Sequence, residues 1–158
     1  MKLVIAIPTL NSEEFLPYTL RSIRREFTGP VVICDQGSTD RTLEIADAFG
    51  CIIFKQDRNF ATGFESDVRN EQLDFCICDG TATHFMQIDS DEIVTTGWLR
   101  AIEQAVTLDD PDYITAPYWQ LIGDARYSEF KNPIEHRRIV YKVTTNLRWT
   151  SRGDDNYH

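Results

Sequence analysis

The sequence predicts an α/β fold: a mostly parallel sheet with helices on both faces, followed by a second half of α+β character. Three observations predict it. Short β-rich runs alternate with helical patterns along the first part of the chain, which is typical of a doubly wound, Rossmann-like sheet. The first run, KLVIAI, is almost entirely apolar, as expected of a strand covered on both faces. From Tyr113 onward, strand-like runs follow one another with less helix between them.

The first strand and the first helix can be placed from local signals. The strand is expected at Lys2–Ile7. Asn11 with Glu14 three residues later predicts a capping box at the start of the helix, and Pro17 is compatible only with its first turn. An apolar face at helical spacing then follows, formed by Leu16, Leu20, Ile23 and Phe27.

The remaining elements follow from the same two periodicities, interrupted by glycine, proline and polar clusters. Ser38 or Thr39 is expected to cap the second helix, and Thr95 or Thr96 the fourth. The remaining strands are expected at Val31–Cys34, Cys51–Phe54, Phe85–Ile88, Tyr113–Trp119 and Arg137–Tyr141. The helices between them are expected around Leu43, Ala46 and Phe49, over Glu65–Cys78, and around Leu99, Ile102 and Val106.

Composition and residue spacing exclude several classes of protein. A net charge of −9 argues against a nucleic-acid partner, since neutralising phosphates requires a surplus of Lys and Arg. No apolar run approaches the roughly 18 to 20 residues that span a bilayer, and the N-terminus reaches Pro8 too soon for a signal peptide. We therefore expect a cytoplasmic protein with no transmembrane segment. The cysteines lack zinc-site spacing and are expected to be reduced core thiols: Cys34, Cys51, Cys76 and Cys78.

Three carboxylates in four residues follow the apolar run of the fourth expected strand, in the sequence FMQIDSDE. Residues i and i+2 of a strand point to the same side, so Asp89 and Asp91 can face one ligand while Ser90 faces away. Paired carboxylates at a strand end suit Mg²⁺ or Mn²⁺, which keeps further positions for water and substrate phosphates. The alternative is a solvated acidic turn in which Asp91 or Glu92 favours the N-terminus of the next helix.

Four stretches resemble, in order and in spacing, the family 2 glycosyltransferases with the GT-A fold: IAIPTLNSEEFLPYTLRSI, VVICDQGSTDRTLEIADAFG, GFESDVRN and FMQIDSDE. In that family, the P-T-x-N and D-x-G-S-T-D turns hold the nucleoside. The Arg of the R-N helix lies near the base and phosphates, and the D-x-D motif binds a divalent metal on the diphosphate. The resemblance implies substrate contacts by Pro8, Thr9, Asp35, Gln36, Arg69, Asp89 and Ser90, with Mn²⁺ or Mg²⁺ held by Asp89 and Asp91.

The resemblance covers residues 2–99 well and the rest poorly. It implies a single GT-A domain over residues 1–158, with a nucleotide-sugar-binding half at 1–99 and a shortened acceptor-side half at 100–158. The final LRWTSRGDDNYH is similar to a W-x-G-x-x-H-E ending of some relatives, which implies His158 as a further metal ligand or phosphate contact. No clear family motif supplies the general base, so four candidates stay open: Asp154, Asp155, Glu129 and Glu135.

The activity implied by the resemblance is inverting transfer of a sugar from a nucleoside-diphosphate sugar to an acceptor hydroxyl that a carboxylate deprotonates. A UDP-sugar is the default donor, although Leu10 and Gln36 stand where relatives often have an aromatic residue and a second Asp. A glycan, a lipid-linked molecule or a protein would be the acceptor. The residues also allow plainer roles, because Asp35 can hold an Asx turn and Arg69 can pair with Glu65.

Two functions from other classes compete with glycosyl transfer. The first is a non-catalytic or truncated GT-A module that binds a nucleotide sugar without turning it over, which the short chain favours and the intact D-x-D disfavours. The second, more remote one is a phosphatase similar to the haloacid dehalogenases. The nucleophilic D-x-D of that class belongs on the first strand, whereas here three strand–helix units precede it and Glu92 replaces the expected glycine.

Overall fold

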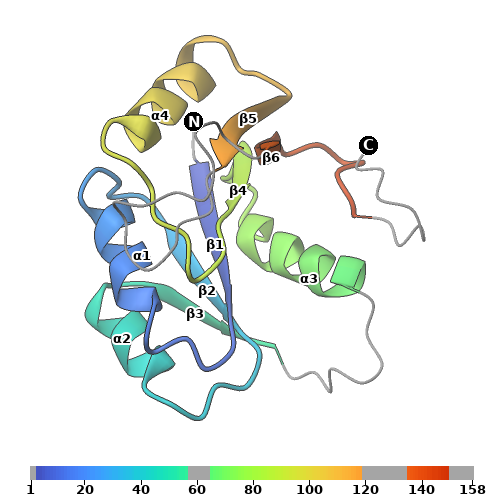
Figure 1. Cartoon of the computed structure of the whole chain (residues 1–158). Helices are drawn as coiled ribbons and strands as arrows, with labels where there is room; N and C mark the ends of the chain where they lie inside the picture. Colours follow the sequence, from blue (N-terminus) through green and yellow to red (C-terminus); the bar gives the residue numbers. More distant parts are fainter. Residues whose placement is uncertain (1–2, 57–64, 119–134, 150–158) are drawn as a thin grey trace.

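The computed structural model describes residues 3–56, 65–118 and 135–149. In chain order its elements are β1 (Leu3–Thr9), α1 (Leu16–Arg24), β2 (Val31–Asp35), α2 (Thr42–Ala48), β3 (Ile52–Lys55), α3 (Glu65–Ile77), β4 (His84–Gln87), α4 (Trp98–Leu108), β5 (Tyr113–Tyr118) and β6 (Glu135–Lys142) (Figure 1). Every strand and helix expected from the sequence is present, with ends that differ by a few residues.

These strands form one sheet in the order β3-β2-β1-β4-β6-β5. Strands β1 to β4 run parallel, β6 runs antiparallel to β4, and β5 runs antiparallel to β6. The mostly parallel sheet with an α+β second half is therefore confirmed. Because parallel strands end at the same edge of a sheet, the segments that follow β1, β2 and β4 meet there, which is where α/β folds usually bind ligands.

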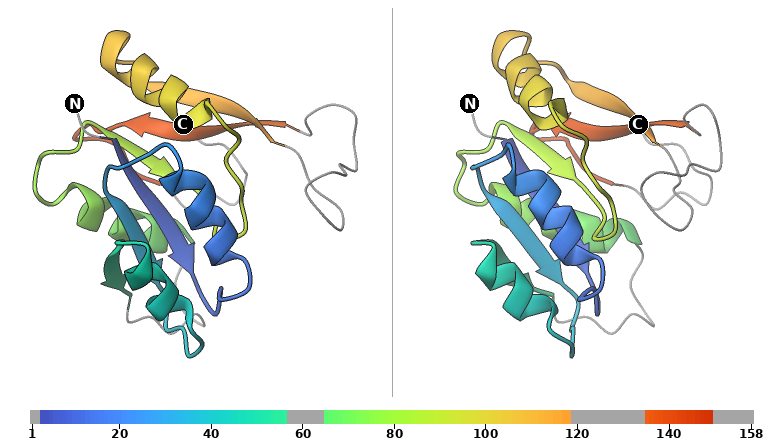
Figure 2. Two further views of the ribbon diagram at one scale, coloured as in Figure 1. Left: turned by 90° about the vertical axis from the view of Figure 1, so that its left-hand side faces the viewer. Right: turned by 60° about the vertical axis from the view of Figure 1, so that its left-hand side comes forward.

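Helices cover both faces of the sheet (Figures 1 and 2). On one face α1, α2 and α4 bury their apolar sides against odd-numbered residues of β1. The buried side chains of this core include Leu3, Ile5, Ile7, Leu20, Ile23, Ile33, Ala46, Met86, Leu99 and Ile102. The period-2 alternation of a strand sends the neighbouring side chains of β1 to the opposite face.

That opposite face is covered by α3 and by the segment that follows β6. Leu73 of α3 packs with Val4, Ala6 and Phe85 in a second core. Trp149 closes this core, with its ring 5.7 Å from that of Phe85 in an edge-to-face arrangement. The residues just before 150 are therefore attached to the body of the domain through α3 and β4.

The expected helix caps are wrong, and the reason lies in the loops. Helix α1 begins at Leu16, with Pro17 in its first turn and no side-chain cap. Asn11 instead has a positive φ of 51° and accepts a hydrogen bond from the backbone N–H of Thr39 at 2.8 Å. Ser38 likewise accepts from the backbone N–H of Asn11 at 2.9 Å rather than capping α2. These side chains accept backbone hydrogen bonds, as a helix cap would, but from the neighbouring loop and not from their own helix.

The cap expected at Thr95 or Thr96 is also wrong. Helix α4 starts after Gly97, whose φ of 85° lies in the left-handed region that favours glycine. The backbone N–H of Gly97 donates to Oε1 of Glu26 at 2.6 Å, so the carboxylate that satisfies this turn comes from the end of α1.

All four cysteines are free thiols. Cys34 and Cys76 are buried together in the α3-side core, as expected, and Cys51 is half-buried. A hydrogen bond with Cys76 and burial raise the pKa of Cys34 far above its usual value, so this thiol stays neutral. Cys78 is exposed, which corrects the expectation that all four lie in the core.

Among the described helices, none has the length and apolar character to cross a membrane.

Candidate functional site

The turns after β1 and β2 form a rigid frame at the carboxyl edge of the sheet. The backbone N–H of Gln36 donates to the carbonyl of Thr9 at 2.9 Å, which extends the β1–β2 pairing beyond the strands. Side chains then connect the two loops in both directions: Ser12 N–H to Thr42 Oγ1 at 2.7 Å, Glu13 N–H to Asp40 Oδ2 at 3.0 Å, and Arg41 N–H to Glu13 Oε2 at 3.0 Å. This cross-linking was not expected from the sequence.

Asp35, the last residue of β2, uses its carboxylate to hold its own turn. It is 2% exposed. Its oxygens accept hydrogen bonds from the backbone N–H groups of Gly37 at 3.1 Å and of Ser38 at 3.1 and 3.3 Å, and from the Thr9 hydroxyl at 3.3 Å. Gly37, with φ of 100°, allows the sharp turn. The turn-holding role is therefore present in the structure, and contact between Asp35 and a nucleoside stays a prediction.

The other residues expected around the nucleoside lie beside Asp35. Thr9 is buried, while Pro8 and Gln36 are half-buried in the same two turns. Leu10, which takes the place of an aromatic residue, exposes 46% of its surface at this edge. The exposed apolar side chain of Leu10, near the half-buried Pro8 and Gln36, offers a surface on which a flat ring can lie.

The D-x-D turn follows β4 at the same edge. Ile88 still pairs with β1, through its N–H to the Ala6 carbonyl at 3.1 Å, and the chain then turns with Glu92 N–H donating to the Asp89 carbonyl at 3.1 Å. Asp89 and Asp91 are exposed. Two carboxylates on one turn are thus presented to solvent immediately beyond the sheet.

Ser90, which is half-buried between the two exposed aspartates, attaches the turn to the segment around α1. Its hydroxyl lies 3.0 Å from the Ser12 hydroxyl, and its carbonyl accepts a hydrogen bond from the Thr19 hydroxyl at 2.8 Å. That Asp89 and Asp91 face one ligand stays a prediction. Ser90 therefore positions the aspartates, and a direct contact with substrate stays a prediction.

Glu92 belongs to this acidic group, and its only role considered in the sequence analysis was to favour the N-terminus of the next helix. Its Oε2 accepts a hydrogen bond from the backbone N–H of Asp89 at 3.0 Å. Burial raises the pKa of the Glu92 carboxyl, the charges of Asp89 and Asp91 raise it further, and the hydrogen bond and Arg137 oppose the rise. Glu92 is thus a half-buried carboxylate that belongs to the same turn as the two exposed aspartates.

Arg69 reaches this edge from α3. Its Nη1 donates to Oε1 of Gln87, the last residue of β4, at 3.0 Å. Gln87 lies two residues before Asp89, so the guanidinium of Arg69 contacts the end of the strand that leads into the D-x-D turn. The role of Arg69 near the base and phosphates stays a prediction. Glu65, the alternative partner, has no described side chain.

Asn70, next to Arg69, has a role that the sequence did not indicate. Its side-chain amide donates to the carbonyl of Trp149 at 2.8 Å and accepts from the backbone N–H of the same residue at 2.9 Å. Arg148 and Asp74 add an ion pair at 2.9 Å. The R-N pair of α3 therefore contacts the end of β4 with one residue and fixes the segment after β6 with the next.

Four expected site residues lie outside the described residues: Glu129, Asp154, Asp155 and His158. Glu135 is described as the first residue of β6, without its side chain. Over residues 3–56, 65–118 and 135–149 there is no group of three or more His, Cys, Asp or Glu side chains that could hold a metal ion. The described part of the chain thus offers Asp89 and Asp91 as a pair of carboxylates that leaves further metal positions to other ligands.

A family sequence model and several known proteins are similar to this chain. The sequence model of glycosyl transferase family 2 matches residues 4–155. The chain is 31% identical over 62 residues to the uncharacterized protein MJ1222 of Methanocaldococcus jannaschii, a match that spans 39% of this chain and 26% of that protein. The fold is similar to that of S. aureus TarS residues 1–349 in complex with UDP, with a TM-score of 0.64 and 22% identity over 79% of this chain and 38% of that one.

The structure of TarS in complex with UDP-GlcNAc matches equally well, with a TM-score of 0.64 and 22% identity over 79% of this chain and 36% of that one. This chain therefore spans less than half the length of the relatives described. Its sheet order, its helices on both faces and the match over nearly its whole length agree: the chain belongs to glycosyl transferase family 2 and has the GT-A fold.

Proposed function

We propose that the protein transfers a sugar, with inversion and with the help of a divalent metal, from a nucleoside-diphosphate sugar to an acceptor hydroxyl. The observation that supports this proposal most is the arrangement at the carboxyl edge of the sheet. Two exposed aspartates lie there on a turn that Ser90 fixes, and Arg69 is hydrogen-bonded to Gln87 at the end of the strand that leads into this turn. Family membership supplies the reaction class.

The donor set fits Mn²⁺ or Mg²⁺, held by Asp89 and Asp91. Both cations take hard oxygen ligands and commonly bind through one or two carboxylates plus substrate phosphates. Burial raises the pKa of Glu92, and the Asp89 and Asp91 charges add to the rise, so the carboxylates of this turn lie close enough to repel one another. When bound, such an ion supplies Lewis-acid stabilisation to the leaving nucleoside diphosphate.

The remaining work falls to groups of the chain itself. The turns of Thr9 and Asp35 would hold the nucleoside, and Arg69 would donate to the diphosphate through charge-assisted hydrogen bonds. A carboxylate would accept the proton of the acceptor hydroxyl, with Asp154, Asp155, Glu129 and Glu135 as the candidates. His158 remains a proposed further ligand, and deletion of residues 154–158 should weaken Mn²⁺-dependent nucleotide binding if it acts there.

The donor and the acceptor are proposed only by class. UDP-sugars are the first to test, since TarS has been crystallised with UDP and with UDP-GlcNAc. The acceptor would be a glycan, a lipid-linked molecule or a protein. A module that binds nucleotide sugar without transfer is the second candidate, because the chain covers only 38% of the TarS chain that it resembles.

The test is an assay of the products released from a panel of nucleoside-diphosphate sugars in the presence of Mn²⁺. A transferase releases nucleoside diphosphate, slowly to water and faster with an acceptor. A phosphatase would release inorganic phosphate, and a binding module would release neither while still binding the nucleotide in calorimetry. Release of diphosphate by the parent but not by Asp91→Asn would support the proposal, and release that is equal in both would contradict it.

A further inference from the structure

A second arginine reaches the acidic turn from β6. Strand β6 pairs with β4 in antiparallel register, with His84 opposite Lys142 and Met86 opposite Val140. Because the two strands are antiparallel, the start of β6, which carries Arg137, runs toward the edge of the sheet at which the acidic turn follows β4. Arg137 is exposed, and its charge acts on Glu92 in the same turn.

The neighbouring residue of β6 has a different environment. The guanidinium of Arg138 lies 4.5 Å from the centroid of the Tyr113 ring, which belongs to β5. This stacking explains Arg138 as a contact within the β5–β6 pair. Side chains of adjacent residues leave a strand on opposite faces, so the two arginines serve different surroundings.

Arg69 and Arg137 approach the acidic turn from different elements. Arg69 comes from α3 and is held by Gln87 at 3.0 Å. Arg137 comes from β6, with the fixed carboxylate of Glu92 as a nearby negative charge, since Oε2 of Glu92 accepts from Asp89 N–H at 3.0 Å. Two arginines thus reach this edge of the sheet, Arg69 at the end of β4 and Arg137 through its charge on Glu92.

We propose that Arg137 binds the diphosphate of the donor and of the leaving nucleotide, opposite Arg69. The proposal rests on the proposed function, because it names a further residue that contacts the same ligand. A nucleoside diphosphate carries more negative charge than one divalent cation neutralises, and the fork of an arginine suits phosphate oxygens at any physiological pH. Before ligand binds, Glu92 serves as the counter-charge. Once the diphosphate is present, Arg137 donates to its oxygens.

The experiment compares Arg137→Ala with Arg138→Ala by calorimetry, in the full chain with Mn²⁺. The ligands are the nucleoside diphosphate that the parent binds best among UDP, GDP, ADP and CDP, and the monophosphate of the same base. Loss of a charge-assisted contact predicts diphosphate affinity lowered about 10- to 100-fold in Arg137→Ala. Monophosphate affinity should fall less, Arg138→Ala should bind the diphosphate like the parent, and Arg137→Lys should recover part of the loss.

Each outcome decides the proposal. Equal diphosphate affinity in Arg137→Ala and the parent would overturn it, and Arg137 would then only balance the charge of Glu92. An equal loss for the diphosphate and the monophosphate would also overturn it, since the effect would not depend on the second phosphate. If the parent binds none of the four diphosphates, this inference and the proposed function both fail. Binding by the parent that is insensitive to Arg137 removes this inference alone.

Discussion

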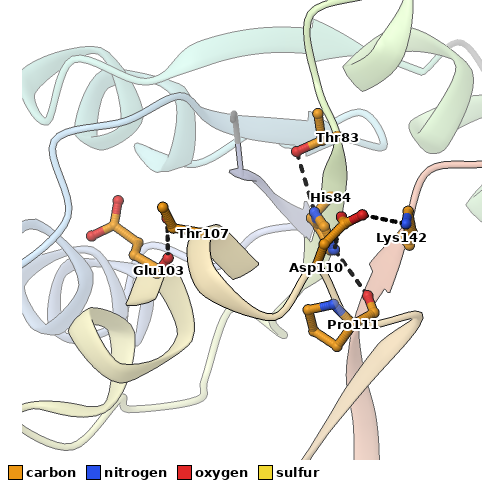
Figure 3. A network of polar contacts seen from close by, with 7 residues as sticks. All are labelled: Thr83, His84, Glu103, Thr107, Asp110, Pro111 and Lys142. Atoms are coloured by element: carbon orange, nitrogen blue, oxygen red, sulfur yellow. Dashed lines mark hydrogen bonds and ion pairs between the residues drawn. The ribbon is translucent and has the colours of Figure 1, made fainter. Parts of the chain in front are cut away.

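The two ends of strand β4 use polar residues in opposite ways. At its start, His84 is fully buried, with Nε2 3.0 Å from the carbonyl of Pro111 and Nδ1 3.2 Å from the hydroxyl of Thr83 (Figure 3). Beyond its far end, four residues after Gln87, Asp91 is exposed in a group of like charges. The buried His84 and the exposed Asp91 are thus only seven residues apart, on either side of one short strand.

The ring of His84 is hydrogen-bonded within the protein, whereas the carboxylates of Asp89 and Asp91 are presented to solvent. A carbonyl can only accept, so Nε2 of His84 donates to Pro111, and Nδ1 is hydrogen-bonded to the Thr83 hydroxyl. Every polar atom of this ring thus has a partner within the protein. The turn at the other end gathers three carboxylates, of which Asp89 and Asp91 are exposed, and their charges repel one another.

The largest effect is expected at the open end. Asp91→Asn should abolish the Mn²⁺-dependent part of nucleoside diphosphate binding, because a neutral amide is a poor ligand for a hard cation. Stability should stay equal or rise slightly, since one of several like charges is removed. Calorimetry with and without Mn²⁺ measures the first effect, and urea unfolding the second.

The control for that experiment is Asp47→Asn, which changes the same charge on the exposed side of α2. It should leave nucleotide affinity unchanged. Retention of full Mn²⁺-dependent affinity by Asp91→Asn would remove the metal site from the D-x-D turn.

The closed end should respond in the opposite way. His84→Leu has a similar volume but leaves the buried carbonyl of Pro111 without its donor, which should lower the free energy of unfolding by about 2 to 3 kcal/mol. Nucleotide affinity, measured well below the melting temperature, should not change. A stable variant with impaired nucleotide binding would show that the two ends of β4 are not separate in function.

Asp35→Ala probes a residue that combines both behaviours, since it lies at the ligand edge and yet is bonded within the fold. Two backbone N–H groups would lose their acceptor, so we expect a loss of about 1 to 3 kcal/mol of stability. If Asp35 also contacts the nucleoside, affinity without metal should fall roughly tenfold or more. Lower stability with unchanged affinity would make Asp35 a turn residue only.

Asp35 also marks how far the sequence could lead. The strands, the helices and the meeting of three turns at one edge follow from apolar periodicity and glycine positions, which are local signals. The cross-loop bonds of Asn11 and Glu13 do not, because a polar side chain near a helix start has the same sequence signature whichever loop it bonds.

The same limit applies to the site. Asp89 and Asp91 were identifiable because strand periodicity and a charge cluster coincide in eight residues. Arg137 was not, since its proximity to Glu92 depends on the register of an antiparallel strand more than 40 residues further along the chain. A signal existed in the Arg-Arg pair of β6, but only the fold shows which of the two faces the turn.

The smallest effect is expected on the exposed rim of the closed end. Lys142 donates to the Asp110 carboxylate and thereby holds its pKa below the usual value, with a further contribution from His84, whose Nε2 lies 3.9 Å away. A depressed carboxyl pKa means that the ion pair stabilises the protein above about pH 4 and that this contribution is lost as the pH falls through the lowered pKa. Asp110→Asn should therefore make the melting temperature slightly less dependent on pH between about pH 5 and pH 3, while Asp47→Asn should reproduce the parent. Because Asp110 is exposed and Lys142 is partly exposed, the change should be much smaller than that of His84→Leu. A larger effect from Asp110→Asn would mean that the ion pair, and not the buried imidazole, secures the start of β4.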